Sequence, residues 1–224
     1  DAVELFYATL KRLSAHGTRP VIAIAGNHDS PDRIEAPNPL ARDNGIILIG
    51  YPKTNYTVGN AEMHFKITQS HESFIEITLK DGQKLRIITA PFANEFRLQE
   101  AFLIQKDVET VNFLTDYWKK IAETYCDNQG VNILVGHHLF LPYAQTQVEE
   151  PDDEKPIQAI SALLPISTIP KQIQYVALGH LHRFQTISTK PTIVYSGSPL
   201  AYSFSEAMQK KYVIILDIEN DMPQ

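Results

Sequence analysis

The sequence predicts an α/β fold in which a mixed β-sheet is flanked by helices. Two observations carry this expectation. Apolar residues recur at helical spacing near both 1–17 and 94–124, and short β-branched apolar runs occur between and after these stretches. The composition agrees, because 43% hydrophobic and 21% charged residues among 224 are typical of one large globular domain or two small ones. We expect two packed sheets with helices outside them.

The chain opens with a helix that leads into a buried strand. Val3, Leu10 and Leu13 lie near helical spacing, and Gly17 is a suitable C-terminal stop. VIAIA (21–25) then predicts a central strand. A helix followed by such a strand is half of a β-α-β crossover, and no strand precedes this helix. We therefore expect a fragment whose opening is cut off and whose first strand or strands are missing.

The middle of the chain is predicted to be richer in strands. Pro31 begins a short helix or loop that runs to Ala41, and GIILIG (45–50) is a second buried strand. HFKIT, SFIEITL and KLRIITA, between 51 and 90, predict an antiparallel region with a hairpin turn at Asp81-Gly82. A long helical pattern follows, from about Asn94 to Thr124.

The last third alternates strands with connections. VNILVGHH (131–138) is a buried strand, and the polar, proline-rich stretch 142–172 predicts a long exposed connection. Three further strands are expected at 174–182, 191–198 and 211–218. No internal repeat is present.

Charge and cysteine content narrow the class of function. The net charge of −6 argues against simple electrostatic binding of nucleic acid, but not against a metal-dependent enzyme, because metal ions bring positive charge of their own. The single cysteine, Cys126, excludes an intrachain disulfide and a zinc–thiolate site, and favours a reducing, cytoplasmic setting. No apolar run approaches the roughly 20 residues needed to span a bilayer, so we expect no membrane association.

Three apolar runs end in the same way. VIAIA is followed by GNHD, NILV by GHH and YVAL by GHLH, so each run stops at a glycine and continues with side chains that can bind metal. Ligand sites in open α/β sheets lie beyond the carboxyl ends of the strands, and glycine there permits close approach of a ligand. Five of the eight histidines lie at these ends: His28, His137, His138, His180 and His182.

Each stretch also has a purely structural explanation. Ser30 as N-cap and Pro31 at the first helical position account for the turn after Gly26, though not for the polar residues between. A strand end with one exposed histidine is commonplace, which would explain GHH. In GHLH, an extended H-x-H directs both imidazoles to one side of the strand, where they can share a metal cluster. The coincidence of three such ends favours a functional site. The other histidines are expected to be solvated: His16, His64 and His71.

These stretches resemble the later part of the signature of the calcineurin-like metallophosphoesterases, in which GNHD, G-H and G-H-x-H follow in this order. YVALGHLHR with VYSGSPLAYSFSEAMQKKY is similar to the SbcD-type nuclease subunits of the double-strand-break repair nuclease family. The resemblance extends over about 1–218 and is firm at 21–33, 131–138 and 174–217. It implies a four-layer α/β/β/α sandwich with two mixed sheets.

The resemblance further implies a site with two divalent ions, usually manganese. Four residues match its metal ligands: Asn27, His137 and His180 for the second ion, and His182 for the first. His28 matches the catalytic histidine that contacts the scissile phosphate and helps the leaving oxygen depart. Asp29 would orient His28. His138 has no counterpart in the pattern.

The chemistry suits these residue types. Two ions about 3.5–4 Å apart lower the pKa of a bridging water and hold the phosphoryl oxygens. Imidazole and oxygen ligands without thiolate suit manganese or iron better than structural zinc. A protonated His28 would stabilise the departing oxyanion.

The sequence also departs from the pattern. Neither D-x-H nor G-D-x-x-D, which supply most ligands of the first ion, occurs in the 224 residues. We therefore expect residues 1–218 to be a phosphoesterase domain that is incomplete at its N-terminus, and 219–224 to begin a linker to a C-terminal cap domain. On its own the chain is expected to bind metal weakly and to lack nuclease activity.

The predicted function is a metal-dependent DNA exonuclease and endonuclease subunit for repair and recombination. By resemblance, its partners would be DNA and an SbcC-type ATPase subunit, with a homodimer inside a heterotetramer. Two alternatives stay open. One is another calcineurin-like phosphoesterase acting on nucleotides or phosphoproteins, and the other is a non-catalytic module that scaffolds an ATPase or a DNA end.

Overall fold

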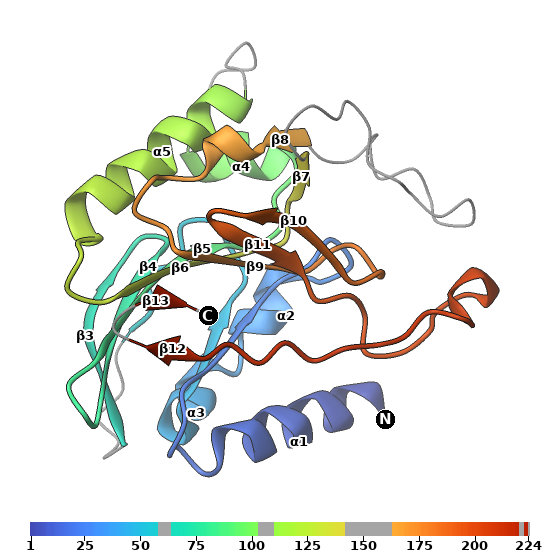
Figure 1. Ribbon diagram of the computed structural model, residues 1–224. Helices are drawn as coiled ribbons and strands as arrows, with labels where there is room; N and C mark the ends of the chain where they lie inside the picture. Colours follow the sequence, from blue (N-terminus) through green and yellow to red (C-terminus); the bar gives the residue numbers. More distant parts are fainter. Residues whose placement is uncertain (58–63, 103–109, 142–162, 220–221, 224) are drawn as a thin grey trace.

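The computed structural model describes residues 1–57, 64–102, 110–141, 163–219 and 222–223, and it is an α/β structure with one large mixed sheet (Figure 1). Helix α1 (Ala2–Ser14) begins at a capping box, in which the Asp1 carboxylate accepts from the backbone N–H of Glu4. It ends at Ala15 in the left-handed conformation. The chain then enters β1 (Val21–Ile24), which pairs in parallel with β2 (Ile46–Ile49).

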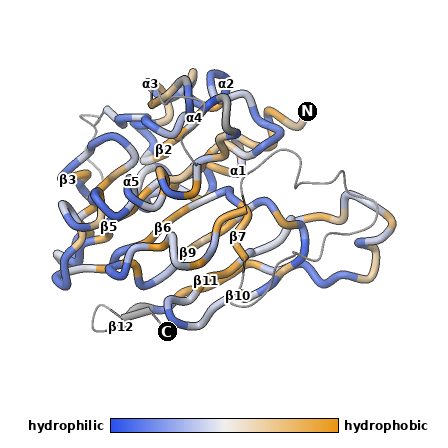
Figure 2. Tube along the Cα trace, turned by 90° about the horizontal axis from the view of Figure 1, so that it is seen from above, coloured by the Kyte–Doolittle hydropathy of each residue, from blue (hydrophilic) through white to orange (hydrophobic). Residues whose placement is uncertain are grey.

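The large sheet has seven strands in the order β10-β11-β9-β6-β5-β4-β3. Its members are β3 (Phe65–His71), β4 (Phe74–Leu79), β5 (Lys84–Ala90), β6 (Val131–Gly136), β9 (Tyr175–Leu178), β10 (Gln185–Thr189) and β11 (Thr192–Tyr195). The four central strands β5, β6, β9 and β11 run in parallel, and antiparallel strands complete both edges. Apolar residues concentrate on the central strands, as Figure 2 shows for β6, β9 and β11.

The remaining elements are short or lie at the periphery. They are α2 (Pro31–Glu35), α3 (Asn38–Ala41), α4 (Glu95–Phe102), α5 (Thr110–Tyr125), β7 (Leu139–Leu141), β8 (Leu163–Pro165), β12 (Ile218–Glu219), β13 (Met222–Pro223) and the 3-10 turns η1 (Arg42–Asn44), η3 (Ile166–Thr168) and η4 (Phe204–Glu206). Helices α4 and α5 lie on one side of the large sheet, and α1 to α3 lie on the opposite side, beyond β1 and β2 (Figure 1).

Three apolar clusters hold these parts together. One joins α5 to the large sheet around Trp118 and Leu134. The second lies between β1–β2 and the large sheet, where Ile49 packs with Ile75 and Ile87. The third joins α1 to the outer side of β2 through Leu10 and Leu48. Strand β2 is therefore buried, which agrees with its uninterrupted apolar sequence. The expectation of a central, buried strand at 21–25 is not met in the described residues, because β1 is only half-buried and pairs with β2 alone.

Most predicted elements are confirmed, but one strand is wrong. The first helix, the strands at 21–25, 45–50 and 131–138, the antiparallel region and the helical pattern after 94 are all present where described. The expected strand at 211–218 is not formed over most of its length, since 211–217 belong to no strand and β12 begins only at Ile218. Strand β10 was not predicted. Of the expected connection at 142–172, residues 142–162 lie outside the described part, and the remainder contains β8 and η3.

Candidate metal centre

The three glycine-ended strands meet at one edge of the fold. Ala90, Gly136, Leu178 and Tyr195 are register partners at the carboxyl ends of the four parallel strands. The end of β1 joins this row because the Phe92 N–H donates to the Ala25 carbonyl (2.9 Å). This bond links the two sheets, so the loops after β1, β6 and β9 converge, as expected for a site at strand ends.

Asn27, His137 and His180 are brought into direct contact there. The Asn27 Oδ1 atom lies 3.0 Å from His137 Nε2 and 3.3 Å from His180 Nδ1. The two imidazole rings are 5.0 Å apart between centroids. Phe92, which is buried, contacts both rings, at 6.2 Å from His137 and 6.1 Å from His180 between centroids. Sequence reasoning missed Phe92, since no pattern marks it.

Two glycines make room for the His137 ring. A Cβ on Gly26 would lie 2.8 Å from His137 Cε1, and a Cβ on Gly179 would lie 2.8 Å from His137 Nδ1. Any side chain at either position would collide with the ring, since carbon contacts near 3.5 Å are the closest comfortable ones. The glycines predicted from the strand-end pattern thus admit an imidazole into the loop cluster.

Burial keeps the two central imidazoles neutral. Desolvation, followed by the nearby histidines, lowers the pKa of His137 to about 3 and that of His180 to about 4. A charge on His28 or on His182 lowers both values further, so these residues lie within electrostatic range. At neutral pH both central rings therefore offer lone pairs without first losing a proton.

His180 has two further features of a functional residue. Its φ of 101° lies in a region that side-chain-bearing residues rarely adopt, at a typical cost of about 1–3 kcal/mol. Its Nε2 atom is buried and makes no hydrogen bond to the described residues. A buried nitrogen without a partner costs free energy unless something binds it. This nitrogen is not the one that faces Asn27, since Nδ1 makes that contact.

His182 turns toward a different neighbour. Its Nδ1 lies 2.8 Å from the Glu206 Oε1 atom, and Glu206 is itself held by Lys211. These contacts, with desolvation opposing them, bring the pKa of Glu206 down to about 2. Glu206 was not singled out from sequence, because it lies 24 residues from His182 on an otherwise exposed segment.

The loop after β1 places the remaining predicted residues at the surface. His28 is exposed, and no hydrogen bond from the described part of the chain fixes its ring. The Asp29 carboxylate accepts from the Gly26 N–H at 2.7 Å and so closes the turn on itself. Its orientation of His28 stays a prediction. Ser30 precedes α2, and Pro31 occupies the first turn, as expected.

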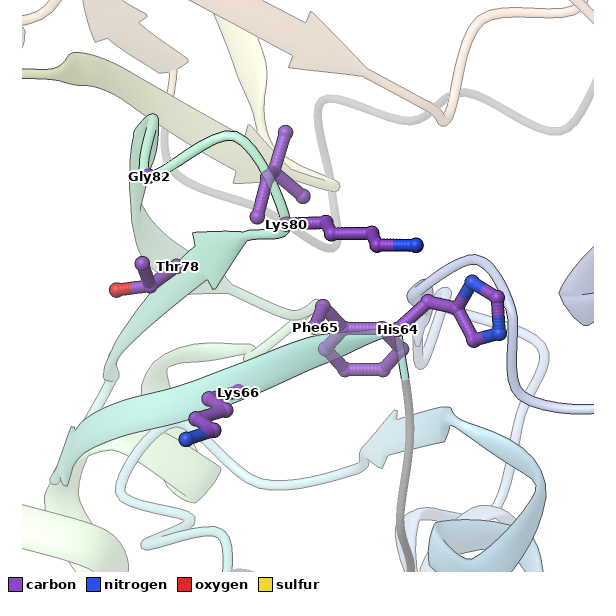
Figure 3. Close-up of a pocket in the computed structure, with 7 residues that line it drawn as sticks. His64, Phe65, Lys66, Thr78, Lys80 and Gly82 are labelled. Carbon is purple, nitrogen blue, oxygen red and sulfur yellow. The ribbon is translucent and has the colours of Figure 1, made fainter.

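The other histidines lie outside this cluster. His16, His64 and His71 are exposed, as predicted. His138 is buried against Trp118, and burial lowers its pKa to about 4. A separate pocket beside the β3–β4 strands contains His64 (Figure 3); Lys80 extends toward it, whereas Lys66 points away, so these basic groups do not converge.

Asn27, His137 and His180 are the described residues that could hold one divalent ion. Within the described ranges, no group of three or more His, Cys, Asp or Glu side chains is arranged to hold a metal. Asn27 completes the set, however, because its amide oxygen joins the imidazoles of His137 and His180 within 3.3 Å. Two imidazoles and one oxygen are ligands that manganese, iron or zinc accept.

The fold and the site together define an α/β protein with a histidine-rich centre at the strand ends. The chain is homologous to the D subunits of SbcCD nucleases. It is 37% identical to the SbcCD nuclease D subunit of Bacillus subtilis over 96% of this chain and 51% of that protein. It is 30% identical to the Staphylococcus epidermidis protein of the same name, over 99% of this chain and 52% of that protein. It is 27% identical to the Staphylococcus saprophyticus protein of the same name, over 98% of this chain and 51% of that protein.

The chain thus spans about half the length of the curated relatives it matches. No family model matches it. Among the described helices, none is both long and apolar enough to cross a membrane.

Proposed function

We propose that this chain carries part of the metal-dependent phosphodiesterase centre of an SbcCD-type nuclease D subunit. The observation that supports it most is the contact between Asn27, from the loop after β1, and the two histidines His137 and His180, which follow β6 and β9. The homology to proteins named as SbcCD nuclease subunits makes DNA the proposed substrate and an SbcC-type ATPase the proposed partner. A homodimer within a heterotetramer is part of the same proposal.

The proposed fold is the four-layer α/β/β/α sandwich. Its support is the apolar cluster between β1–β2 and the large sheet, with α1 on one outer side and α5 on the other. This arrangement suits the site, because a loop from each sheet reaches the same edge. The β1 loop brings Asn27 and His28, and the large sheet brings the other histidines.

Asn27, His137 and His180 would hold one ion, and His182 would serve a second. We propose manganese, which tolerates mixed nitrogen and oxygen ligands. When bound, such ions activate water and neutralise phosphoryl oxygens. The low pKa of His137 and His180 keeps these rings as ligands at neutral pH. His28, which is exposed beside them, is free to meet a phosphate and give a proton to the leaving oxygen.

The test uses the intact D subunit with its ATPase partner. His137→Ala should lower Mn²⁺ affinity in calorimetry and lower hydrolysis of linear duplex DNA by at least 100-fold. His28→Ala should lower hydrolysis similarly and leave Mn²⁺ affinity within about twofold, because it is not a ligand. His64→Ala, on the far edge of the sheet, is the control. Faster hydrolysis of a small phosphodiester than of DNA would reject DNA as the substrate. Unchanged Mn²⁺ affinity of His137→Ala would reject the metal centre.

A further inference from the structure

A buried carboxylate holds the C-terminal arm, residues 199–217, against the metal-capable edge. Glu206 is 1% exposed, and it is the only buried residue of the arm, all of which is described. Its neighbours Phe204 and Met208 are almost fully exposed. Apolar packing therefore contributes little to placing this segment, which loops away from the large sheet in Figure 1, although Tyr212 contacts the Phe184 ring at 4.7 Å between centroids. The buried polar contacts of the arm are those of Glu206.

Those contacts use both carboxylate oxygens. Oε1 faces His182 Nδ1 at 2.8 Å, and Oε2 accepts from the Lys211 ammonium and, at 3.3 Å, from the Ser198 hydroxyl. Lys211 also donates to Ser198 Oγ (2.8 Å) and to the His182 carbonyl (3.3 Å). A buried carboxylate is tolerated only with such partners, and removing one usually costs several kcal/mol. The cluster is thus a rigid support rather than a surface ion pair.

The hydrogen bond decides which nitrogen of His182 carries the proton. With the carboxylate ionised beside Lys211, Oε1 only accepts, so Nδ1 must be the N–H donor. A neutral imidazole protonated on Nδ1 has its lone pair on Nε2. The Tyr202 ring, 5.4 Å from the His182 ring between centroids, contacts it as well. The arm therefore sets both the tautomer and the orientation of this histidine.

We propose that Glu206 is a positioning residue that holds His182 in its Nδ1–H tautomer and presents Nε2 as the metal-binding atom, with Lys211 and Ser198 fixing Glu206. This inference rests on the proposed function, in which His182 is a ligand. Carboxylates that orient metal-binding histidines in this way change metal affinity by 10–100-fold when removed.

The first test reads the tautomer without any metal. Long-range ¹H–¹⁵N spectra of the ¹⁵N-histidine-labelled chain, assigned with His182→Gln, should show His182 protonated on Nδ1. In Glu206→Gln the amide oxygen should face the donors Lys211 and Ser198, which leaves its NH₂ group toward Nδ1. The proton should then move to Nε2. A neutral wild-type ring protonated on Nε2 instead of Nδ1 would overturn the proposal whether or not the variant folds, as would an unchanged tautomer in Glu206→Gln.

The second test reads Mn²⁺ binding by calorimetry on the intact D subunit, as in the test of the proposed function. Glu206→Gln should bind 10–100-fold more weakly, and Glu206→Asp, which keeps a carboxylate acceptor, should recover part of the affinity. Glu76→Gln is the matched control: Glu76 is equally buried and contacts Arg86 and Lys84, but no imidazole. It should bind as the wild type does. If Glu206→Gln switches the tautomer but leaves Mn²⁺ affinity unchanged, His182 is not a metal ligand. That outcome would contradict the proposed function while leaving the contact between Glu206 and His182 intact.

Discussion

Gly179 and Gly26 matter to the site because of the atoms they lack. The His137 imidazole fills the space where a side chain on either residue would stand. That ring in turn lies against Asn27. The effect of these glycines on the site is therefore steric.

Gly179→Ala should push the His137 ring away from Asn27, because the new Cβ would lie 2.8 Å from its Nδ1. We expect a loss of about 1–3 kcal/mol in the free energy of unfolding, typical of overpacking. Mn²⁺ affinity should fall at least tenfold in calorimetry.

Gly82→Ala provides the matched control for that change. Gly82 has a φ of +89°, and no atom lies within 4 Å of the place that its Cβ would take. It should cost only the backbone strain, about 1 kcal/mol, and leave Mn²⁺ affinity unchanged. Equal losses of affinity in both variants would contradict a steric role for Gly179.

His138 gives the stability of the fold a pH dependence. Burial, and then the nearby His180, lowers its pKa to about 4, while a hydrogen bond to the Pro91 backbone opposes the shift. In the unfolded chain His138 is protonated below about pH 6.5, whereas in the folded chain it stays neutral down to about pH 4. Stability from this residue is therefore complete above pH 6.5 and falls as the pH drops toward 4.

His138→Gln should remove this part of the pH dependence. Between pH 7.5 and 5.0, urea unfolding of the wild type should lose about 2 kcal/mol more than that of the variant, from one proton at 1.36 kcal/mol per pH unit. The exposed His64→Gln should follow the wild-type curve. Parallel curves for the wild type and His138→Gln would show that His138 titrates normally in the folded state.

At the scale of the elements, the strand ends could be predicted and the arm could not. VIAIA, NILV and YVAL are each followed by a glycine, and two of these glycines leave room for the His137 ring. This requirement involves residues next to the strand ends, so it can be recognised in the sequence. The contacts of Glu206 with His182 and of Phe92 with His137 join residues far apart in sequence. No periodicity or spacing signals such pairs, since only the folded sheet brings them together.

The failed strand at 211–218 has a related cause. KYVIILDI has strong β-propensity, but a strand is stable only when another strand pairs with it and its apolar face is covered. In the described structure neither holds: Val213 is 88% exposed and Ile215 is 83% exposed. Propensity alone therefore predicted an element that this structure does not form.

Truncating the exposed apolar side chains at 213 and 215 should consequently cost little. Val213→Ala and Ile215→Ala are each expected to change the free energy of unfolding by less than about 0.5 kcal/mol, as for exposed positions generally. Ile193→Ala, at a fully buried site in β11, should cost about 2–5 kcal/mol. Urea denaturation measures all three. A loss above 2 kcal/mol for either arm variant would mean that residues 211–217 are packed in solution.

At the scale of the whole molecule, two sheets contribute unequal parts of one site. The bond from Phe92 to Ala25 brings the β1 loop to the edge of the large sheet, where the two central histidines already stand. The described donors form one close set, Asn27 with His137 and His180, while His182 is held 2.8 Å from Glu206. Chemistry that needs two ions would therefore find at most one close set of three donors among the described residues.

The 224-residue chain by itself should consequently bind Mn²⁺ weakly and hydrolyse duplex DNA no faster than His137→Ala of the same chain. Two-ion phosphodiester hydrolysis depends on both ions to activate water and to stabilise the leaving oxygen, so one ligand set cannot support it. Calorimetry with Mn²⁺, beside an exonuclease assay on linear DNA, measures both properties. The full-length Bacillus subtilis relative serves as the positive control in the same buffer. Robust Mn²⁺-dependent turnover by this chain, abolished in His137→Ala, would show that the residues described here already hold both ions.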